Sequence, residues 1–305
     1  MKILLLGSRG MVGSSVSRVL KKNNSINLFE STRNDTNLFS LAETQKLFSD
    51  FKPNIVINSA AKVGGILAND LQRTEFILNN LKININIIES LIKFPEIKLI
   101  NLGSSCIYPL GADVPITESS LLTGKLEPTN SPYAMAKLAA IEMGDAISKQ
   151  YGHEVIDLMP TNLYGPNDNF SENESHVIPG LISRMHRAKI ENKEKFKVWG
   201  TGTPLREFLF VDDLAKAIEF MVLKNVKPGL YNVGSNEEIT IKALVEKIKN
   251  VIEFSGEIVF DDTKPDGNPR KLLDSTKFNT LGWKPSIGLQ QGLKTTYEWF
   301  LDNKN

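Results

Sequence analysis

A glycine-rich stretch near the start of the chain places the strongest constraint on its fold. A short apolar run at residues 2–6 leads directly into Gly7-Ser-Arg-Gly10-Met-Val-Gly13, and a helical pattern covers residues 11–22. A strand, a tight glycine turn and a helix in this order form the phosphate-binding unit of dinucleotide-binding folds. The alternative is a turn with a purely structural role, but the strand–turn–helix context favours binding. The residues expected at the site are Gly7, Arg9, Gly10, Met11, Val12 and Gly13.

The first half of the chain alternates short apolar runs with longer helical patterns. We expect strands at residues 2–6, 26–30, 55–58, 98–102 and 154–159. We expect helices between them at residues 11–22, 41–51, 71–94 and 132–151. This alternation predicts an α/β fold, a Rossmann-type doubly wound parallel sheet with helices on both faces.

The rhythm changes after Pro160, where loop signals such as Gly165-Pro166 interrupt it. Helices are expected at residues 176–190, 211–223, 240–252 and 288–301, and strands at 197–199, 229–233 and 258–260. These elements predict a smaller C-terminal α/β substrate lobe that closes over the carboxyl edge of the sheet. We therefore expect a dinucleotide-binding domain at residues 1–165, completed by part of 208–235, and mainly a substrate-binding lobe at 166–305.

The residues after the second strand indicate which dinucleotide is bound. NAD sites commonly place an acid there for the ribose 2′-hydroxyl, whereas NADP sites place a cation near the 2′-phosphate. This chain has both Glu30 and Arg33, with Arg9 in the glycine loop beneath. Glu30 lies early for the NAD role, and Arg33 can bind a phosphate through two nitrogens. We predict NADP(H) as the cofactor; the alternative is that Arg33 is a solvated surface charge.

Three polar residues have the spacing of a carbonyl-reducing centre. Ser104 follows the fourth strand, and Tyr133 and Lys137 lie at positions i and i+4 of one helix. A lysine cation near a phenol lowers the pKa of the phenol, so that the phenol can exchange a proton near neutrality. The phenol would give its proton to the carbonyl oxygen of a ketone substrate, and Ser104 would donate a second hydrogen bond to that oxygen. A Tyr-x-x-x-Lys pair alone is common on helices, but here it accompanies a glycine loop and a serine-bearing strand end.

Composition excludes several other classes of function. The chain has 36 basic and 35 acidic residues, so no overall field steers it to nucleic acid or to a membrane. The first apolar run is too short for a signal sequence, and no stretch reaches membrane-spanning length. Cys106 is the only cysteine, which excludes an intrachain disulfide. We expect a cytoplasmic protein without a metal, because no cluster of His, Cys and Asp has metal-ligand spacing.

The chain resembles the extended short-chain dehydrogenase/reductases. Within them it is most similar to the enzymes that epimerise C3 and C5 and reduce C4 of GDP-4-keto-6-deoxy-D-mannose. The resemblance covers nearly the whole chain, and its motifs lie at residues 7–13, 60–66, 102–109, 126–130, 159–166, 175–179, 198–202 and 264–274. The glycine loop and Tyr-x-x-x-Lys are shared across the superfamily, whereas Ser-Ser-Cys-Ile-Tyr-Pro and Ser-His-Val-Ile-Pro are much more specific.

The resemblance implies a role for individual residues. Tyr133, Lys137 and Ser104 would form the reductase centre, and Cys106 with His176 would form the acid/base pair for epimerisation. The positions implied at the NADP(H) site are Arg33, Leu102, Lys137, Asn162, Leu163 and His176. The positions implied at the GDP-sugar are Arg184, Trp199, Arg206 and Asp274. The resemblance also implies a homodimer joined through helices 71–94 and 132–151.

The extra acid/base pair suits chemistry next to a ketone. A C4 ketone acidifies the protons on C3 and C5, and a thiol and an imidazole both titrate near neutrality. The alternatives are that Cys106 is a packing residue and that His176 is a helix cap; His153 and His186 are expected to be structural or exposed. Two rival functions remain. One is a C4 reductase of another GDP-4-keto sugar, such as a 6-deoxy-heptose, and the other is a non-catalytic nucleotide sensor.

Overall fold

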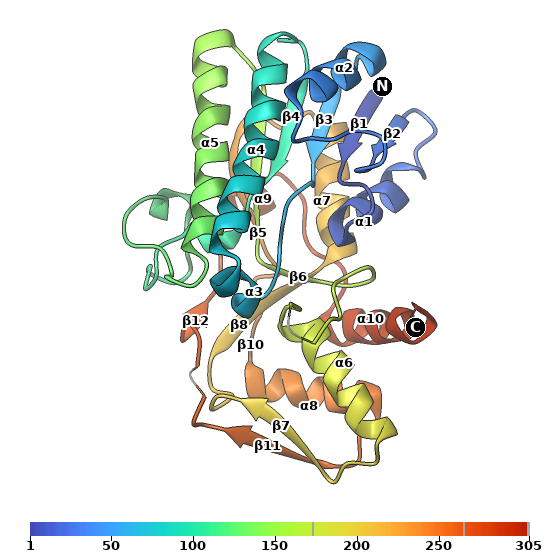
Figure 1. Ribbon diagram of the computed structural model, residues 1–305, viewed down its shortest axis with the longest axis vertical. Helices are drawn as coiled ribbons and strands as arrows, with labels where there is room; N and C mark the ends of the chain where they lie inside the picture. The colour runs from blue at the N-terminus through green and yellow to red at the C-terminus, as the bar shows by residue number, and fades with distance from the viewer. Residues whose placement is uncertain (173, 265, 304–305) are drawn as a thin grey trace.

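The computed structural model describes residues 1–172, 174–264 and 266–303. A six-stranded parallel sheet forms its upper part (Figure 1). Its strands, in spatial order, are β2 (Asn27–Ser31), β1 (Lys2–Leu6), β3 (Ile55–Asn58), β4 (Lys98–Leu102), β5 (Val155–Pro160) and β9 (Gly229–Val233). The four central strands are buried nearly throughout, which is why their sequences read as continuous apolar runs. The predicted Rossmann-type parallel sheet is confirmed.

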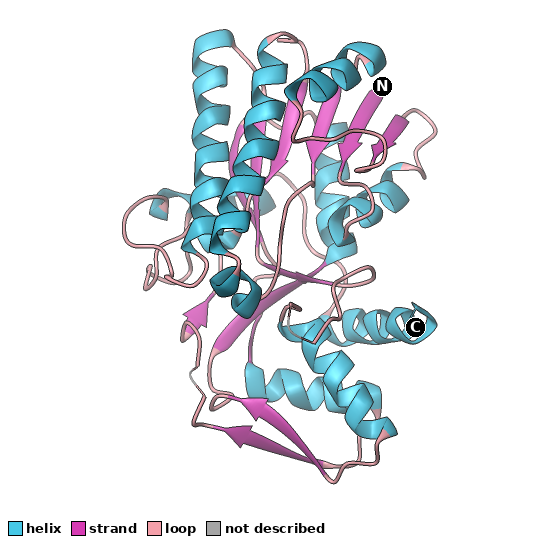
Figure 2. Cartoon of the chain, in the orientation of Figure 1, coloured by secondary structure: helices cyan, strands magenta, loops and turns pink. Residues whose placement is uncertain are grey.

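Helices cover both faces of this sheet (Figures 1 and 2). One face carries α2 (Leu41–Phe51), α4 (Arg73–Ile92) and α5 (Ser131–Tyr151), and the other carries α1 (Met11–Leu20) and α7 (Val211–Lys224). Successive residues of a strand point to opposite faces. Accordingly, Ile3 and Leu5 pack toward α1 and α7, whereas Leu4 and Leu6 pack toward α2 and α4.

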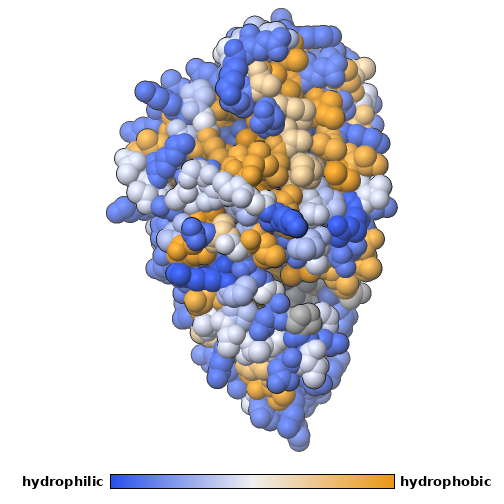
Figure 3. All heavy atoms as spheres, turned by 90° about the vertical axis from the view of Figure 1, so that its left-hand side faces the viewer, coloured by the Kyte–Doolittle hydropathy of each residue, from blue (hydrophilic) through white to orange (hydrophobic). Residues whose placement is uncertain are grey.

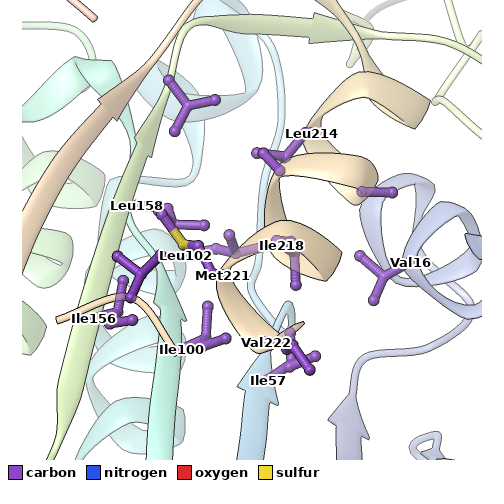
Figure 4. Packing of buried hydrophobic residues seen from close by; sticks show 14 of the residues in the cluster. Val16, Ile57, Ile100, Leu102, Ile156, Leu158, Leu214, Ile218, Met221 and Val222 are labelled. Carbon is purple, nitrogen blue, oxygen red and sulfur yellow. The ribbon is translucent and has the colours of Figure 1, made fainter. Parts of the chain in front are cut away.

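The core beneath α7 joins the two halves of the chain. In Figure 4, Leu214, Ile218 and Met221 of α7 lie against Ile100 and Leu158 of the central strands. Together with β9, which pairs with β5, this helix belongs to the six-stranded unit although it follows the loop-rich region. Hydrophobic burial of this kind contributes about 25 cal/mol per Å² of apolar surface, and it packs α7 into the core of the six-stranded sheet.

The lower part of the molecule is a smaller α/β unit. A short sheet combines β6 (Asn162–Tyr164), β8 (Leu205–Phe210), β10 (Glu238–Thr240) and β12 (Arg270–Lys271), and β7 (Lys195–Trp199) pairs with β11 (Glu257–Asp261). The helices here are α6 (Val177–Ile190), α8 (Ile241–Ile252) and α10 (Leu289–Asn303), which share a separate hydrophobic core. The remaining elements are α3 (Ile66–Leu71), α9 (Thr276–Asn279) and the 3₁₀ turns Ser105–Ile107 and Glu118–Ser120.

Several expected boundaries were wrong. The helix expected at 71–94 corresponds to α4, which begins at Arg73 and ends at Ile92. The short helix α3 before it was not expected, and Gln72, with φ −117° and ψ 40°, separates the two. The short strands β6, β8, β10 and β12 were not expected. β6 and the start of β8 lie in the region 161–207, which reads mainly as loop, and β10 and β12 have only 3 and 2 residues, too few for a periodic signal. His176 precedes α6 as its N-cap instead of being its first residue. Within the described ranges, no helix is long and apolar enough to cross a membrane.

Candidate active site

The glycine loop has the geometry of a phosphate cradle. Gly7 adopts φ +75°, and a side chain there would meet the Ala60 backbone at 2.7 Å. A side chain at Gly13 would overlap the Gly7 carbonyl and lie 2.7 Å from Cα of Ser8, so α1 can approach β1 only with glycine there. A side chain at Gly10 would meet only the Gly7 oxygen, at 3.5 Å. Packing within the chain therefore does not require glycine at position 10, which leaves room for a pyrophosphate.

The first turn of α1 is also suited to an anion. Gly10 is the N-cap, and no side chain caps the helix. The backbone N–H groups of this turn are therefore available to a ligand, and the positive end of the helix dipole adds to their attraction for phosphate. Met11 and Val12 begin this turn, and Arg9, which is exposed, precedes the N-cap.

Glu30 and Arg33, the two residues that could contact the cofactor ribose, have different environments at the end of β2. The Glu30 carboxylate accepts a hydrogen bond from Ser17 Oγ at 2.5 Å and forms an ion pair with Lys21. Arg33 is exposed and forms no ion pair or hydrogen bond with any described residue. Because Glu30 is engaged with α1 while Arg33 is free, this end of the sheet fits a 2′-phosphate better than a 2′-hydroxyl.

Ser104, Tyr133 and Lys137 lie together at the carboxyl end of β4. Tyr133 forms a hydrogen bond with Ser104, and Lys137 Nζ lies 5.9 Å from the centre of the Tyr133 ring. Lys137 Nζ donates a hydrogen bond to the Leu102 carbonyl at 2.6 Å. Pro132 in the first turn of α5 and the i, i+4 spacing thus bring the phenol and the ammonium to one face, as the sequence predicts.

The pKa of Tyr133 differs from the expectation that Lys137 lowers it. Burial is the main cause that raises the pKa of Tyr133 above its ordinary value, Cys106 adds to the rise, and the hydrogen bond with Ser104 opposes it. Burial also lowers the pKa of Lys137 to about 8, against the favourable charge of Asp157. The phenol is therefore protonated at neutral pH, which is the form that donates a proton to a carbonyl oxygen.

Cys106 lies in a turn that packs against α5, the helix of Tyr133. It is the middle residue of the 3₁₀ turn that follows β4, and its backbone N–H donates to Ser104 Oγ at 3.2 Å. Lys271 Nζ donates to Cys106 Sγ at 3.8 Å from the end of β12. Lys271 was not singled out from the sequence, because a lysine 165 positions away from the cysteine carries no local signal of this contact.

His176 approaches the sheet edge from the lower lobe. Its side chain is 46% exposed, and its Nδ1 lies 4.0 Å from Oδ1 of Asp168. No hydrogen bond joins His176 to Cys106 or Tyr133 among the described residues. Asp168 is a second residue that the sequence did not single out, and its only sequence signal is the turn Gly165-Pro166-Asn167 before it.

The remaining candidate positions have separate environments. Asn162 Nδ2 donates to the Glu207 carbonyl at 2.8 Å, and Leu163 packs against the core of the large sheet. Arg184 lies over the Phe196 ring at 5.5 Å, and burial lowers its pKa, as it does for Arg206.

The other two candidate substrate positions lie at the ends of elements of the lower lobe. Trp199 is 63% exposed at the end of β7, so its ring is free to stack on a planar ligand. Arg206 pairs in register with Lys271, which links it to the Cys106 region. Asp274 Oδ1 accepts a hydrogen bond from the backbone N–H of Thr276 at 2.9 Å. Among the described residues, the Asp274 carboxylate has no other hydrogen-bond donor. Within residues 1–172, 174–264 and 266–303, no group of three or more His, Cys, Asp or Glu residues could hold a metal ion.

The comparisons with known proteins agree with this geometry. The model of the NAD dependent epimerase/dehydratase family matches residues 3–234. The chain belongs to this family. GDP-L-fucose synthase 1 of Arabidopsis thaliana is 49% identical over 302 residues, which cover 99% of this chain and 94% of that protein.

Two solved structures share the fold at 31% sequence identity. A GDP-6-OMe-4-keto-L-xylo-heptose reductase from C. jejuni superposes with a TM-score of 0.92 over 99% of this chain and 98% of the other. A GDP-L-fucose synthetase from Naegleria fowleri bound to NADP superposes with a TM-score of 0.89 over 99% of this chain and 93% of the other. The proteins similar to this chain thus include both a heptose reductase and enzymes of GDP-L-fucose synthesis.

Proposed function

We propose that this chain uses NADPH to convert GDP-4-keto-6-deoxy-D-mannose into GDP-L-fucose, by epimerisation at C3 and C5 and reduction at C4. The observation that carries the proposal is the cluster at the end of β4, where Cys106 is hydrogen-bonded to Ser104 in a 3₁₀ turn that packs against α5, the helix of Tyr133 and Lys137. Reduction at C4 would use Tyr133, Ser104 and Lys137 and would need no thiol. The additional thiol, with a cation from Lys271 against its sulfur, supplies an acid/base group for neighbouring carbons.

NADP(H) would be held by groups from three elements. The glycine loop and the α1 N-terminus fit the pyrophosphate, Arg33 fits the 2′-phosphate and Lys137 fits the ribose hydroxyls. Leu102, Asn162 and Leu163 would lie toward the nicotinamide. When bound there, the reduced dinucleotide supplies the hydride for C4. The NADP-bound relative from Naegleria fowleri supports this choice of cofactor.

Epimerisation requires a base, a stabilised enolate and an acid. One member of the Cys106–His176 pair removes the proton from C3 or C5, and negative charge develops on the C4 oxygen. Tyr133 and Ser104 donate hydrogen bonds to that oxygen and stabilise the enolate. The other member of the pair returns a proton to the opposite face of the carbon, which inverts it. The same steps at the second carbon complete the change from the D to the L series.

In the reduction, the C4 oxygen of the sugar receives a proton from Tyr133. Because burial keeps Tyr133 protonated, its hydroxyl transfers a proton to the C4 oxygen as hydride reaches C4. Lys137 would then hold the ribose and stabilise the phenolate left behind, provided that its ammonium is charged. Ser104 keeps the carbonyl oxygen in place through both reactions.

The two parts of the molecule would divide the ligands between them. We propose that residues 1–165 and part of 208–235 bind NADP(H), and that residues 166–305 mainly bind the GDP-sugar. Arg184 and Arg206 would contact phosphate oxygens, because both guanidinium groups are partly buried without an acidic partner within 4 Å among the described residues. Trp199 would stack on the base or the sugar, and Asp274 would accept a hydrogen bond from a hydroxyl or an amine.

The assembly proposed is a homodimer joined through α4 and α5. The side of the molecule that carries α5 has hydrophobic residues gathered on its upper half (Figure 3). Leu78, Ile85 and Met135 on these helices are between 42% and 47% exposed. Four helices from two copies would bury this surface. A cytoplasmic location is part of the same proposal, supported by the single cysteine and the balanced charge.

Substrate choice tests the function against its nearest rival. The heptose reductase from C. jejuni favours the alternative, a C4 reductase of another GDP-4-keto sugar. We would measure NADPH oxidation with GDP-4-keto-6-deoxy-D-mannose and with a GDP-4-keto-6-deoxy-heptose. The proposal expects kcat/KM to be at least about tenfold higher for the hexose. A preference for the heptose would transfer the assignment to the rival.

A further inference from the structure

We propose that Asp168 is the positioning residue for His176: its carboxylate holds a proton on Nδ1 of the imidazole and leaves Nε2 to face the sugar. The proposal takes one thing from the proposed function, namely that the substrate of His176 is a sugar. The carboxylate oxygen Oδ1 lies 4.0 Å from Nδ1. The two side chains differ in exposure, since the imidazole is 46% exposed and the carboxylate only 5%. A buried acid behind a partly exposed imidazole orients the ring and selects its tautomer.

The backbone fixes Asp168 in place. Its N–H donates to the Gly165 carbonyl at 3.3 Å and closes a turn with Pro166 at the second position and Asn167 at the third. Asn167 has φ +63°, which is the geometry that a type II turn requires at that position. Gly165 and Pro166 are buried, and Gly165 has φ +152° against Val211. The turn is therefore anchored to the core, and the carboxylate cannot drift with a loose loop.

One oxygen of the Asp168 carboxylate is available to accept a further hydrogen bond. Oδ1 accepts the backbone N–H of Asn169 at 2.8 Å, but Oδ2 is buried and has no hydrogen-bond partner among the described residues. An unpaired buried carboxylate oxygen is costly. The imidazole of His176 is the one basic side chain within 4.0 Å of this carboxylate in the described part of the chain. A small rotation of either side chain would turn the contact into a hydrogen bond, as catalytic contacts tighten when substrate binds.

The backbone before His176 is held by the glycine pair that follows β3. Gly65 N–H donates to the Glu174 carbonyl at 2.8 Å, and a side chain on Gly65 would overlap the Ser175 carbonyl. From the other side, a side chain on Gly180 would come within 2.6 Å of Ser175 Oγ. The residue that leads into His176 is thus enclosed by two glycines. The motif at residues 60–66, which the chemistry above does not use, gains a role here: it fixes the Cα of His176 while Asp168 fixes the ring.

The tautomer of His176 gives a test that does not depend on the substrate. The chain has only three histidines, so His176→Asn assigns the imidazole signals in a long-range ¹⁵N–¹H spectrum. At about pH 8, the wild type should show the Nδ1–H tautomer at His176. Asp168→Asn should shift the signals toward Nε2–H. Glu172→Gln, on the same loop but paired with Arg187 at 3.0 Å, should leave them unchanged.

Exchange kinetics test the consequence for catalysis. We would follow solvent deuterium entering the 4-keto sugar, with NADPH affinity and thermal stability measured on the same variants. Asp168→Asn should slow exchange about tenfold to a hundredfold and leave NADPH binding unchanged. On a His176→Asn background it should have no further effect, because the two residues act as one unit.

The outcomes separate this proposal from the proposed function. An unchanged tautomer in Asp168→Asn, or additive losses in the double variant, would overturn the positioning role. A wild type that exchanges no deuterium but shows the tautomer shift would leave the Asp168–His176 pair standing and refute only the epimerase function. A drop in thermal stability with normal exchange would make Asp168 a structural residue and refute the proposal.

Discussion

Replacing Gly10 by alanine should weaken cofactor binding without lowering the stability of the fold. Gly10→Ala adds a methyl group that would meet the chain only at the Gly7 oxygen, at 3.5 Å, an ordinary contact. Its backbone, with φ −70° and ψ 169°, is open to alanine. The matched control is Gly13→Ala, where the methyl group would overlap the Gly7 carbonyl and lie 2.7 Å from Cα of Ser8. Both changes add one methyl group to the same loop.

The expected magnitudes differ between binding and stability. In Gly10→Ala, the loss of an N-cap glycine and the gain from a less flexible unfolded chain are each below about 1 kcal/mol and oppose each other. The methyl group would instead keep the pyrophosphate from the backbone N–H groups. Losing one or two charge-assisted hydrogen bonds of about 1.5 kcal/mol each weakens NADPH binding about tenfold to a hundredfold. Gly13→Ala should cost about 1–3 kcal/mol of stability through overpacking.

Two measurements on each variant suffice. Thermal unfolding without dinucleotide reports stability, and quenching of protein fluorescence by NADPH reports affinity. We expect Gly10→Ala to melt with the wild type but bind NADPH weakly, and Gly13→Ala to melt several degrees lower. Wild-type affinity in Gly10→Ala would show that the pyrophosphate does not approach this loop. Equal losses of stability in both variants would contradict the conclusion that a methyl group fits at position 10 but not at position 13.

Three further predictions concern the cofactor and the reductase centre. Arg33→Ala should weaken NADPH binding about tenfold or more and leave NADH binding unchanged; equal loss for both dinucleotides in fluorescence titrations would remove Arg33 from the 2′-phosphate site. Tyr133→Phe should lower the rate of C4 reduction about a hundred- to ten-thousand-fold at nearly unchanged NADPH affinity, and near-normal turnover would sink the assignment of the proton donor. Because burial lowers the pKa of Lys137 to about 8, its ammonium is present below that pH and lost above it. NADPH affinity should therefore fall as pH rises through about 8, whereas Lys137→Met should bind weakly without this dependence; a flat wild-type profile would contradict the role.

The fold could be predicted where local sequence and local geometry carry the same information. Gly7 needs its positive φ and Gly13 its close approach, and both requirements act within a few residues of the glycine itself. The central strands read as apolar runs because helices cover both of their faces. Tyr133 and Lys137 share a helix face through their spacing alone. In each case, no distant part of the chain is needed to complete the argument.

Other features depend on contacts that no short stretch encodes. Helix α3 has only 6 residues before Gln72, which is too short for apolar periodicity to predict it. Lys271 reaches Cys106 only because β12 pairs with β8, and Asp168 reaches His176 only because a buried turn faces the start of α6. The pKa of Tyr133 was expected to fall because the spacing shows a nearby lysine, but the spacing does not show the burial that dominates.

Isotope incorporation during turnover tests the central claim most directly. The enzyme would be run in D₂O with NADPH and GDP-4-keto-6-deoxy-D-mannose, and the product analysed by NMR and mass spectrometry. The account predicts GDP-L-fucose with solvent deuterium at both C3 and C5. Cys106→Ser should incorporate little deuterium and yield mainly unepimerised product, because a hydroxyl is a poor base at neutral pH. A wild-type product of the D series without deuterium would contradict the account and identify a simple C4 reductase.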